Sequence, residues 1–288
     1  LFGAMPATAQ ALELQITQEY TGQDKHVCFL APMWSDVLNF PPRGETHPAR
    51  LAGELAAIAG VMNLGDARNW TGHLLAQANT YAFGRLAWDP TLTPAEIAAE
   101  WTQLTFGRDL DVNAVVNRIL LESWRTFEDY TSPLGLGLLS RRVDHFYPDI
   151  ANRADYHGGT ATGVGFDRTV ATGTGYAGQY LEPWRSRFET LTDCPEELLL
   201  FLHHVPYTHR LKNGRTLIQE LYDRHFAGVE RVRGFLRDWE QLRGKIDDER
   251  FAHVRERLEA QIGYAEDWCR AFNGYFQTLS GIRSEEHT

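Results

Sequence analysis

The pattern of apolar and polar residues divides the chain into two parts, and the first part, residues 1–89, alternates strand-like with helix-like stretches. Apolar and polar residues alternate over residues 12–17, as in a strand with one buried face. Residues 56–64 form a short continuous apolar run, which predicts a strand buried on both faces. Helices are predicted over residues 34–40 and 70–88. This order is typical of a βα-repeat fold with parallel strands.

Helical periodicity dominates the second part, residues 90–282. Thr93 is a predicted N-cap, followed by a proline and, three residues after the cap, by Glu96, so a helix should run from here to Gly107. Further helices are predicted over residues 111–130, 195–205, 216–242 and 247–279. Residues 132–182, rich in Gly, Pro, Asp and Tyr, interrupt the pattern and should form a long ordered loop region. The predicted fold class is therefore α/β followed by all-α.

Both ends of the chain look unnatural. The first residue is Leu1, so we expect the natural protein to begin earlier. Residues 283–288 carry no apolar periodicity and resemble the translation of a sequencing adapter. We therefore treat them as a non-native tail and leave them out of the fold prediction.

Composition and charge narrow the classes of function. The 288 residues carry 28 Lys and Arg against 38 Asp and Glu, a net charge of −10, so we expect no nucleic-acid partner. No apolar run approaches the roughly 18 residues of a membrane helix, so we expect no membrane segment. The three cysteines are too scattered for a disulfide framework or a zinc cluster, and the adjacent His203 and His204 lack the spacing of metal ligands. We expect no metal, and the free thiols favour the cytoplasm.

Glu19 is the candidate for acid or base chemistry. It stands at the C-terminal end of the first predicted strand, and strand ends on that face build the active site of a (β/α)₈ barrel. Asn69 and Trp70 follow the second strand and would lie on the same face. From the residues alone, a solvated strand-end carboxylate remains the more common explanation for Glu19, and Trp70 is as often a core residue as a ligand platform.

A series of motifs resembles the xylan-directed α-glucuronidases, glycoside hydrolase family 67. In chain order they are residues 15–22 (QITQEYTG), 31–34 (APMW), 69–73 (NWTGH), 76–79 (AQAN), 81–90 (YAFGRLAWDP), 132–136 (SPLGL), 165–169 (GFDRT), 178–180 (GQY), 203–206 (HHVP), 214–217 (GRTL) and 275–278 (YFQT). They span nearly the whole chain, which makes the resemblance far more specific than any single motif. Thr80 departs from it, because many members have Trp there.

The resemblance implies a fold and an activity. Residues 1–89 would be the last two βα units of the (β/α)₈ TIM barrel, and residues 90–282 the C-terminal helical domain. Members hydrolyse, with inversion and without a metal or organic cofactor, the α-1,2 bond between (4-O-methyl)glucuronic acid and the terminal xylose of xylo-oligosaccharides. Glu19 matches a Glu that shares the general-base role with an Asp. That Asp, the general acid and the residues that clamp the glucuronate carboxylate would all precede Leu1.

The resemblance also implies partners. The substrates would be aldouronic acids derived from glucuronoxylan, with Asn69 and Trp70 as candidate substrate-binding residues. The helical domain would form a homodimer, for which the helix at 216–242 offers apolar candidates: Leu217, Leu221, Phe226, Val229, Val232, Phe235 and Leu236. Members are variously intracellular, membrane-attached and secreted, and we expect the cytoplasm. The alternative function is a non-catalytic helical module for dimerisation or carbohydrate contact.

Overall fold

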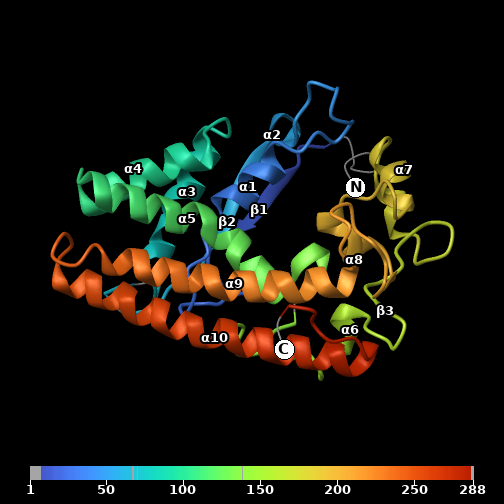
Figure 1. Cartoon of the computed structure of the whole chain (residues 1–288). Helices are drawn as coiled ribbons and strands as arrows, with labels where there is room; N and C mark the ends of the chain where they lie inside the picture. Colours follow the sequence, from blue (N-terminus) through green and yellow to red (C-terminus); the bar gives the residue numbers. More distant parts are fainter. Residues whose placement is uncertain (1–7, 67, 70, 138, 287–288) are drawn as a thin grey trace.

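The computed structural model describes residues 8–66, 68–69, 71–137 and 139–286, and it shows a small α/β part lying across a slab of helices (Figure 1). The α/β part contains β1 (Ala11–Gln15), α1 (Ala31–Leu38), α2 (Leu51–Glu54), β2 (Ala57–Val61), the 3₁₀ turn η2 (Leu74–Ala76) and α3 (Gln77–Trp88). The two strands pair in parallel, with Ala11 opposite Ala57 and Gln15 opposite Val61. The predicted βα-repeat is confirmed.

The predicted burial of the second strand on both faces is wrong for this chain. In β2 only Ile58 is half-buried, and the other four residues are exposed. In the described part of the chain β1 is the one strand paired with β2, and α3 packs on it from one side. A strand is buried on both faces only when other elements cover both faces. The described neighbours of β2 do not, so most of its apolar residues remain exposed.

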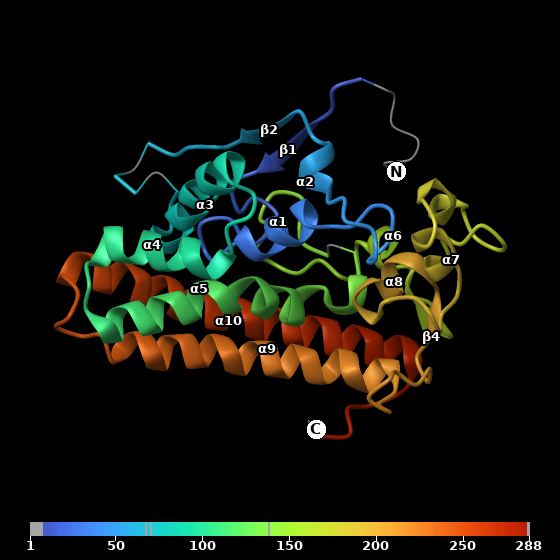
Figure 2. The ribbon, with the colours of Figure 1, turned by 90° about the horizontal axis from the view of Figure 1, so that it is seen from above.

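Four long helices form the slab: α4 (Pro94–Phe106), α5 (Leu110–Thr131), α9 (Leu217–Glu240) and α10 (Asp248–Ser280). Figure 2 shows α9 and α10 running side by side, with α5 packed against α9. The predicted capping box of α4 is present, because Thr93 Oγ1 accepts from the Glu96 N–H at 3.2 Å and Glu96 Oε2 accepts from the Thr93 N–H at 2.8 Å. None of the helices in the described ranges combines the length and apolar character needed to cross a membrane.

The helix predicted over residues 195–205 is wrong in its extent. The chain makes a 3₁₀ turn, η5 (Glu196–Leu198), and a single helical turn, α8 (Leu199–Leu202). It becomes extended at His203, and β4 (Val205–Pro206) pairs antiparallel with β3 (Gly163–Val164). A short continuous apolar run does not distinguish helix from strand, and here it contains both.

The long loop region is confirmed as largely irregular. It holds short elements: η3 (Pro133–Gly135), α6 (Ala154–His157), β3 and η4 (Tyr176–Gln179), followed by α7 (Trp184–Glu189). Many of its residues are buried, among them Leu136, Leu139 and Ile150. The segment is therefore part of the packed protein.

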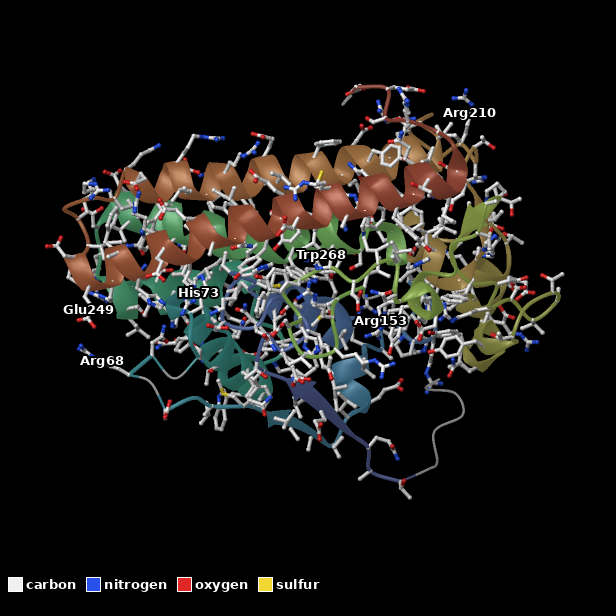
Figure 3. All side chains as sticks on the ribbon, turned by 90° about the horizontal axis from the view of Figure 1, so that it is seen from below. Arg68, His73, Arg153, Arg210, Glu249 and Trp268 are labelled. Atoms are coloured by element: carbon white, nitrogen blue, oxygen red, sulfur yellow. The ribbon has the colours of Figure 1, made fainter. Side chains whose placement is uncertain are left out.

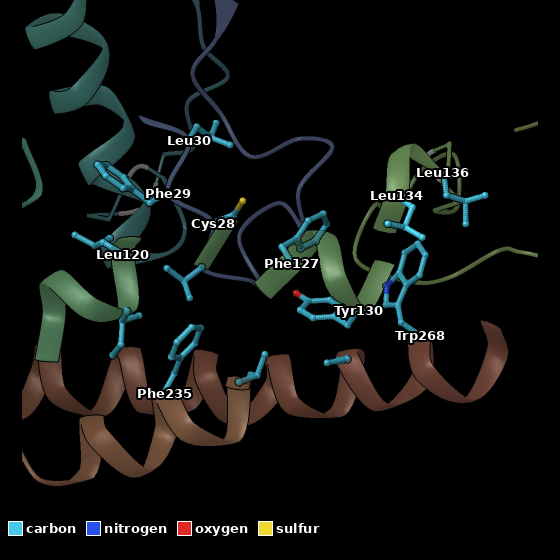
Figure 4. Packing of buried hydrophobic residues seen from close by; sticks show 14 of the residues in the cluster. Cys28, Phe29, Leu30, Leu120, Phe127, Tyr130, Leu134, Leu136, Phe235 and Trp268 are labelled. Carbon is cyan, nitrogen blue, oxygen red and sulfur yellow. The ribbon is translucent and has the colours of Figure 1, made fainter. Parts of the chain in front are cut away.

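One hydrophobic core runs through both parts of the chain. Cys28, Phe29 and Leu30 of the α/β part belong to the same buried cluster as Phe127 of α5 and Phe235 of α9 (Figure 4). All three cysteines are buried free thiols. Burial raises the pKa of the Cys28 thiol to about 12, so this sulfur is an inert packing residue.

The apolar face of α9 is occupied within the chain. Five of the seven residues expected to offer surface for dimerisation are buried against neighbouring helices: Leu217, Leu221, Val229, Val232 and Phe235. Phe226 and Leu236 are partly buried against the same core. The apolar residues named as dimerisation candidates are therefore largely covered within the chain.

Candidate active site

A cleft of about 400 Å³ opens at the C-terminal ends of β1 and β2. Three segments line it, the one after β1, the one after β2 and the turn before α3: Ile16, Thr17, Gln18, Glu19, Gln23, Asp24, Met62, Asn63, Leu64, Gly65, Thr71, Gly72 and Ala76. Parallel strands end at the same edge of a sheet, so both strand-end loops contribute to one site. Glu19 lies in this cleft, as the sequence predicted for a strand-end residue.

The Glu19 carboxylate is half-buried and oriented by two side-chain amides. Gln15 Nε2, from the last residue of β1, donates to Glu19 Oε2 at 2.8 Å, and Asn63 Nδ2, just after β2, donates to the same oxygen at 3.1 Å. Both bonds fall on Oε2, which turns Oε1 away from these two amides. The carboxylate thus has a defined orientation in a cleft where it can accept a proton.

The turn that carries Glu19 is held from inside by Gln18. This buried side chain donates to the backbone carbonyls of Gln23 at 3.2 Å and His26 at 2.5 Å. Gly22 has φ +93°, and a Cβ at this position would collide with the His26 ring. Glycine is therefore required for the chain to fold back tightly behind Glu19.

The side chain of Asn69 forms hydrogen bonds within the protein and does not line the cleft. Its Oδ1 accepts from Thr71 Oγ1 at 3.1 Å and Gln77 Nε2 at 2.8 Å, and its Nδ2 donates to His253 Nε2 at 3.1 Å. His253 Nε2 also accepts from the Leu74 N–H at 3.2 Å. The structure does not bring Asn69 together with Glu19, so its role in substrate binding stays a prediction. Trp70 lies outside the described residues.

The loop after β2 is tied to the start of α10. Burial is the main cause that lowers the pKa of His253, and Arg257 adds to it; both favour the neutral ring, whose Nε2 accepts these bonds. At the surface, Arg68 donates to Glu249 at 2.9 Å, and Figure 3 shows these two side chains side by side. The helical part of the chain thus fixes one wall of the active-site region.

Sequence reasoning missed three contributors to the site. Asn63 lies two residues beyond the end of β2, but the strand predicted over residues 56–64 contained it, so the strand-end argument passed over it. His145 contacts the Glu19 carbonyl oxygen through Nδ1 at 2.6 Å, and Asp24 pairs with Arg257 of α10 at 3.4 Å. Neither of these contacts has a local signal, because the partners are far apart in the chain.

The predicted absence of metal ligands at His203 and His204 rests on spacing, and the structure shows how His204 is used instead. His204 Nδ1 lies 2.8 Å from the Gly165 carbonyl oxygen. Among the described residues, no group of three or more His, Cys, Asp or Glu side chains is arranged to hold a metal ion.

Comparison with known proteins identifies the class as glycoside hydrolases. Residues 71–288 match the family model described as glycosyl hydrolase family 67 C-terminus, and residues 1–70 match the family 67 middle domain. The chain belongs to glycosyl hydrolase family 67. The family resemblance inferred from the motifs is confirmed.

The chain is similar to fungal proteins named α-glucuronidase A. It is 40% identical over 300 residues to alpha-glucuronidase A of Emericella nidulans, covering 99% of this chain and 35% of that protein. It is 40% identical over 302 residues to probable alpha-glucuronidase A of Aspergillus oryzae, covering 100% of this chain and 36% of that protein. The chain therefore spans about a third of the length of these relatives.

Proposed function

We propose that this chain is part of an inverting α-glucuronidase and that Glu19 acts in it as general base. The observation that carries the proposal is the position of Glu19 in the turn that follows a parallel strand, oriented by two amides in a cleft. The chain belongs to a glycoside hydrolase family, and the relatives that it resembles are named α-glucuronidase.

The proposed architecture places residues 1–89 in a (β/α)₈ barrel, with residues 90–282 as the helical domain and 283–288 as a non-native tail. The parallel pairing of β1 with β2 supports this, because strands in such a barrel are all parallel. Val61 is 46% exposed and Leu64 63%, as expected at an edge that further strands would cover. The two family models meet between residues 70 and 71. We keep the boundary after residue 89 because α3 packs on β2.

Inversion sets the geometry that Glu19 must satisfy. An inverting glycosidase uses a carboxylic acid to protonate the leaving oxygen and a carboxylate about 6.5–9.5 Å away to activate a water on the opposite face of the sugar. Glu19, together with an Asp outside this chain, would take the proton from that water. The substrate would be (4-O-methyl)glucuronic acid linked α-1,2 to the terminal xylose of an aldouronic acid. These proton transfers require no metal or organic cofactor.

The stereochemistry of the product tests this proposal. A full-length enzyme carrying this chain should release methylglucuronic acid from aldouronic acids, and proton NMR should show the β-anomer before mutarotation. Initial release of the α-anomer would contradict a general-base role for Glu19, because retention uses a carboxylate nucleophile. No release from any aldouronic acid would overturn the proposed activity itself.

We further propose a homodimer through residues 90–282 and a cytoplasmic location. The dimer rests on the family resemblance, since the apolar face of α9 is already covered. A monomeric mass for the full-length enzyme in light scattering at micromolar concentration would refute it. The location is supported by three buried thiols that form no disulfide. Recovery of activity in the periplasm or medium of the native cells would contradict it.

A further inference from the structure

We propose that His145 is a positioning residue for Glu19, holding the backbone of the Glu19 turn from the outside. This inference rests on the proposed general-base role of Glu19. It assigns a catalytic consequence to the long loop region of the helical part, because His145 lies 126 residues after Glu19 in the chain.

His145 meets the Glu19 turn with both its edge and its face. Its Nδ1 lies 2.6 Å from the Glu19 carbonyl oxygen, and its Nε2 lies 3.1 Å from the Arg142 carbonyl oxygen. A carbonyl oxygen only accepts, so the ring is the donor in the bond to Glu19. The ring also stacks on Tyr20, with centroids 4.7 Å apart and planes 22° from parallel. His145 itself is only 8% exposed. The ring is thus confined against the two residues at the tip of the turn.

The segment that carries His145 is anchored independently of the site. The Arg141 N–H donates to the Tyr147 carbonyl at 3.1 Å, which closes the segment into a loop. Trp268 Nε1, from α10, donates to the Phe146 carbonyl at 3.0 Å. A second contact joins this loop to the same turn, because Gln23 Nε2 donates to the Val143 carbonyl at 3.2 Å. The loop is therefore a fixed support.

The hydrogen bonds that hold the Glu19 turn from inside and from outside fix different groups. Gln18 holds the interior of the turn, and Gln15 and Asn63 orient the carboxylate, but the peptide of Glu19 itself is held by His145. A general base must lie within hydrogen-bond reach of its water, and a misplacement of about 1 Å can cost about 10²-fold in rate. Release of the peptide would therefore lower kcat while leaving the remote contacts to substrate unchanged.

The test uses two substitutions in a full-length enzyme carrying this chain. His145→Phe keeps a flat ring against Tyr20 but removes the donor, and His145→Asn places an amide N–H near the position of Nδ1. We expect kcat of H145F to fall about 10-fold with KM within about twofold, and H145N to recover most of the loss. Val143→Ala, at a 78% exposed side chain of the same loop, is the matched control and should keep the parent kcat.

A double-mutant cycle separates positioning from general structural damage. If His145 acts through Glu19, H145F should have no further effect on kcat in a Glu19→Ala background. Equal losses from H145F in both backgrounds, or a parent-like kcat for H145F, would overturn the role of His145. If H145F does not fold, H145N is compared with His145→Leu, which offers no hydrogen-bond donor. Equally low kcat values for these two variants would also overturn the role of His145. A parent-like kcat for Glu19→Ala would instead overturn the proposed general-base role of Glu19, on which this inference rests.

Discussion

Gln261, in the middle of α10, accepts a hydrogen bond of 3.0 Å from the backbone N–H of Val27, 234 residues earlier in the chain. The same side chain donates to the Tyr130 hydroxyl at 3.1 Å. Val27 begins a buried stretch without regular structure, and its neighbours are satisfied in the same way: the Phe29 N–H donates to Ser123 Oγ and the Leu30 N–H to Asn79 Oδ1, both at 2.8 Å. Buried side chains thus replace a sheet partner for this segment.

Replacement of Gln261 should therefore destabilise the chain. Gln261→Leu fills the space but leaves the Val27 N–H without an acceptor, which costs about 1–3 kcal/mol for a buried donor. Urea unfolding monitored by circular dichroism should show a loss in this range. Gln277→Leu, at an exposed position of the same helix, should change the unfolding free energy by less than about 0.5 kcal/mol. Equal losses in the two variants would contradict a specific role for Gln261.

Glu19→Gln should lower kcat of the full-length enzyme by at least about 10²-fold, because it removes the charge that accepts the proton of the attacking water. KM should change much less, since most substrate contacts are made elsewhere. Steady-state kinetics on a reduced aldouronic acid measures both constants. Glu13→Gln, at an exposed position on β1, is the control and should behave as the parent. A kcat for Glu19→Gln within about threefold of the parent would assign the base role to the Asp alone.

The 288-residue chain by itself should hydrolyse no aldouronic acid. Its two paired strands cannot close a barrel, and under the proposal the general acid lies outside the chain. Incubation of the purified chain at high concentration, followed by chromatography of the products, measures this directly. Detectable methylglucuronic acid would show that the described cleft is a complete active site.

The chain should lose stability in mild acid because of its buried histidines, His26 and His225 among them. Burial lowers the pKa of both His26 and His225 to about 3. Their pKa in the unfolded chain is about 6.5, so the unfolded state binds more protons below that pH. Stability is therefore complete above about pH 6.5 and falls as the pH drops towards 3, by up to about 1.4 kcal/mol per pH unit for each histidine.

The pH dependence of unfolding in His225→Phe tests this mechanism. The variant removes one titrating group, so the unfolding free energy should decline less steeply between pH 6.5 and 4.5 than in the parent, whatever its absolute value. His47→Phe, at an exposed position, is the control and should keep the parent slope. An unchanged slope in His225→Phe would exclude this ring as a source of acid sensitivity.

Sequence patterns predicted the elements whose ends are set by residues close by in the chain. The capping box at Thr93 and the glycine at 281 in the left-handed conformation mark the ends of α4 and α10 in the sequence itself. The strand-end position of Glu19 was predictable because it depends only on the βα order. The burial of β2 was not predictable, since it depends on which other elements pack on the strand.

The remaining parts of the site depend on partners distant in the chain. His145 sits in a segment with no regular pattern, and nothing near residue 145 indicates the carbonyl of Glu19 as its partner. Asn69 has the polarity of a sugar-binding residue, but its amide is used to join the loop after β2 to His253. Polarity alone does not distinguish these two uses, because both require the same hydrogen-bonding groups.

One face of α10 has a consequence for the exchange of segments between related enzymes. Residues at steps of three and four along this helix contact the loops behind the cleft: His253, Arg257, Gln261, Tyr264 and Trp268. Recombination at the border between the two parts would separate this face from the loops of the first part that it contacts, which include Asp24, Val27 and Leu74. A chimera that preserves catalysis should therefore inherit residues 18–30, 63–74 and 141–147 from the same parent as α10.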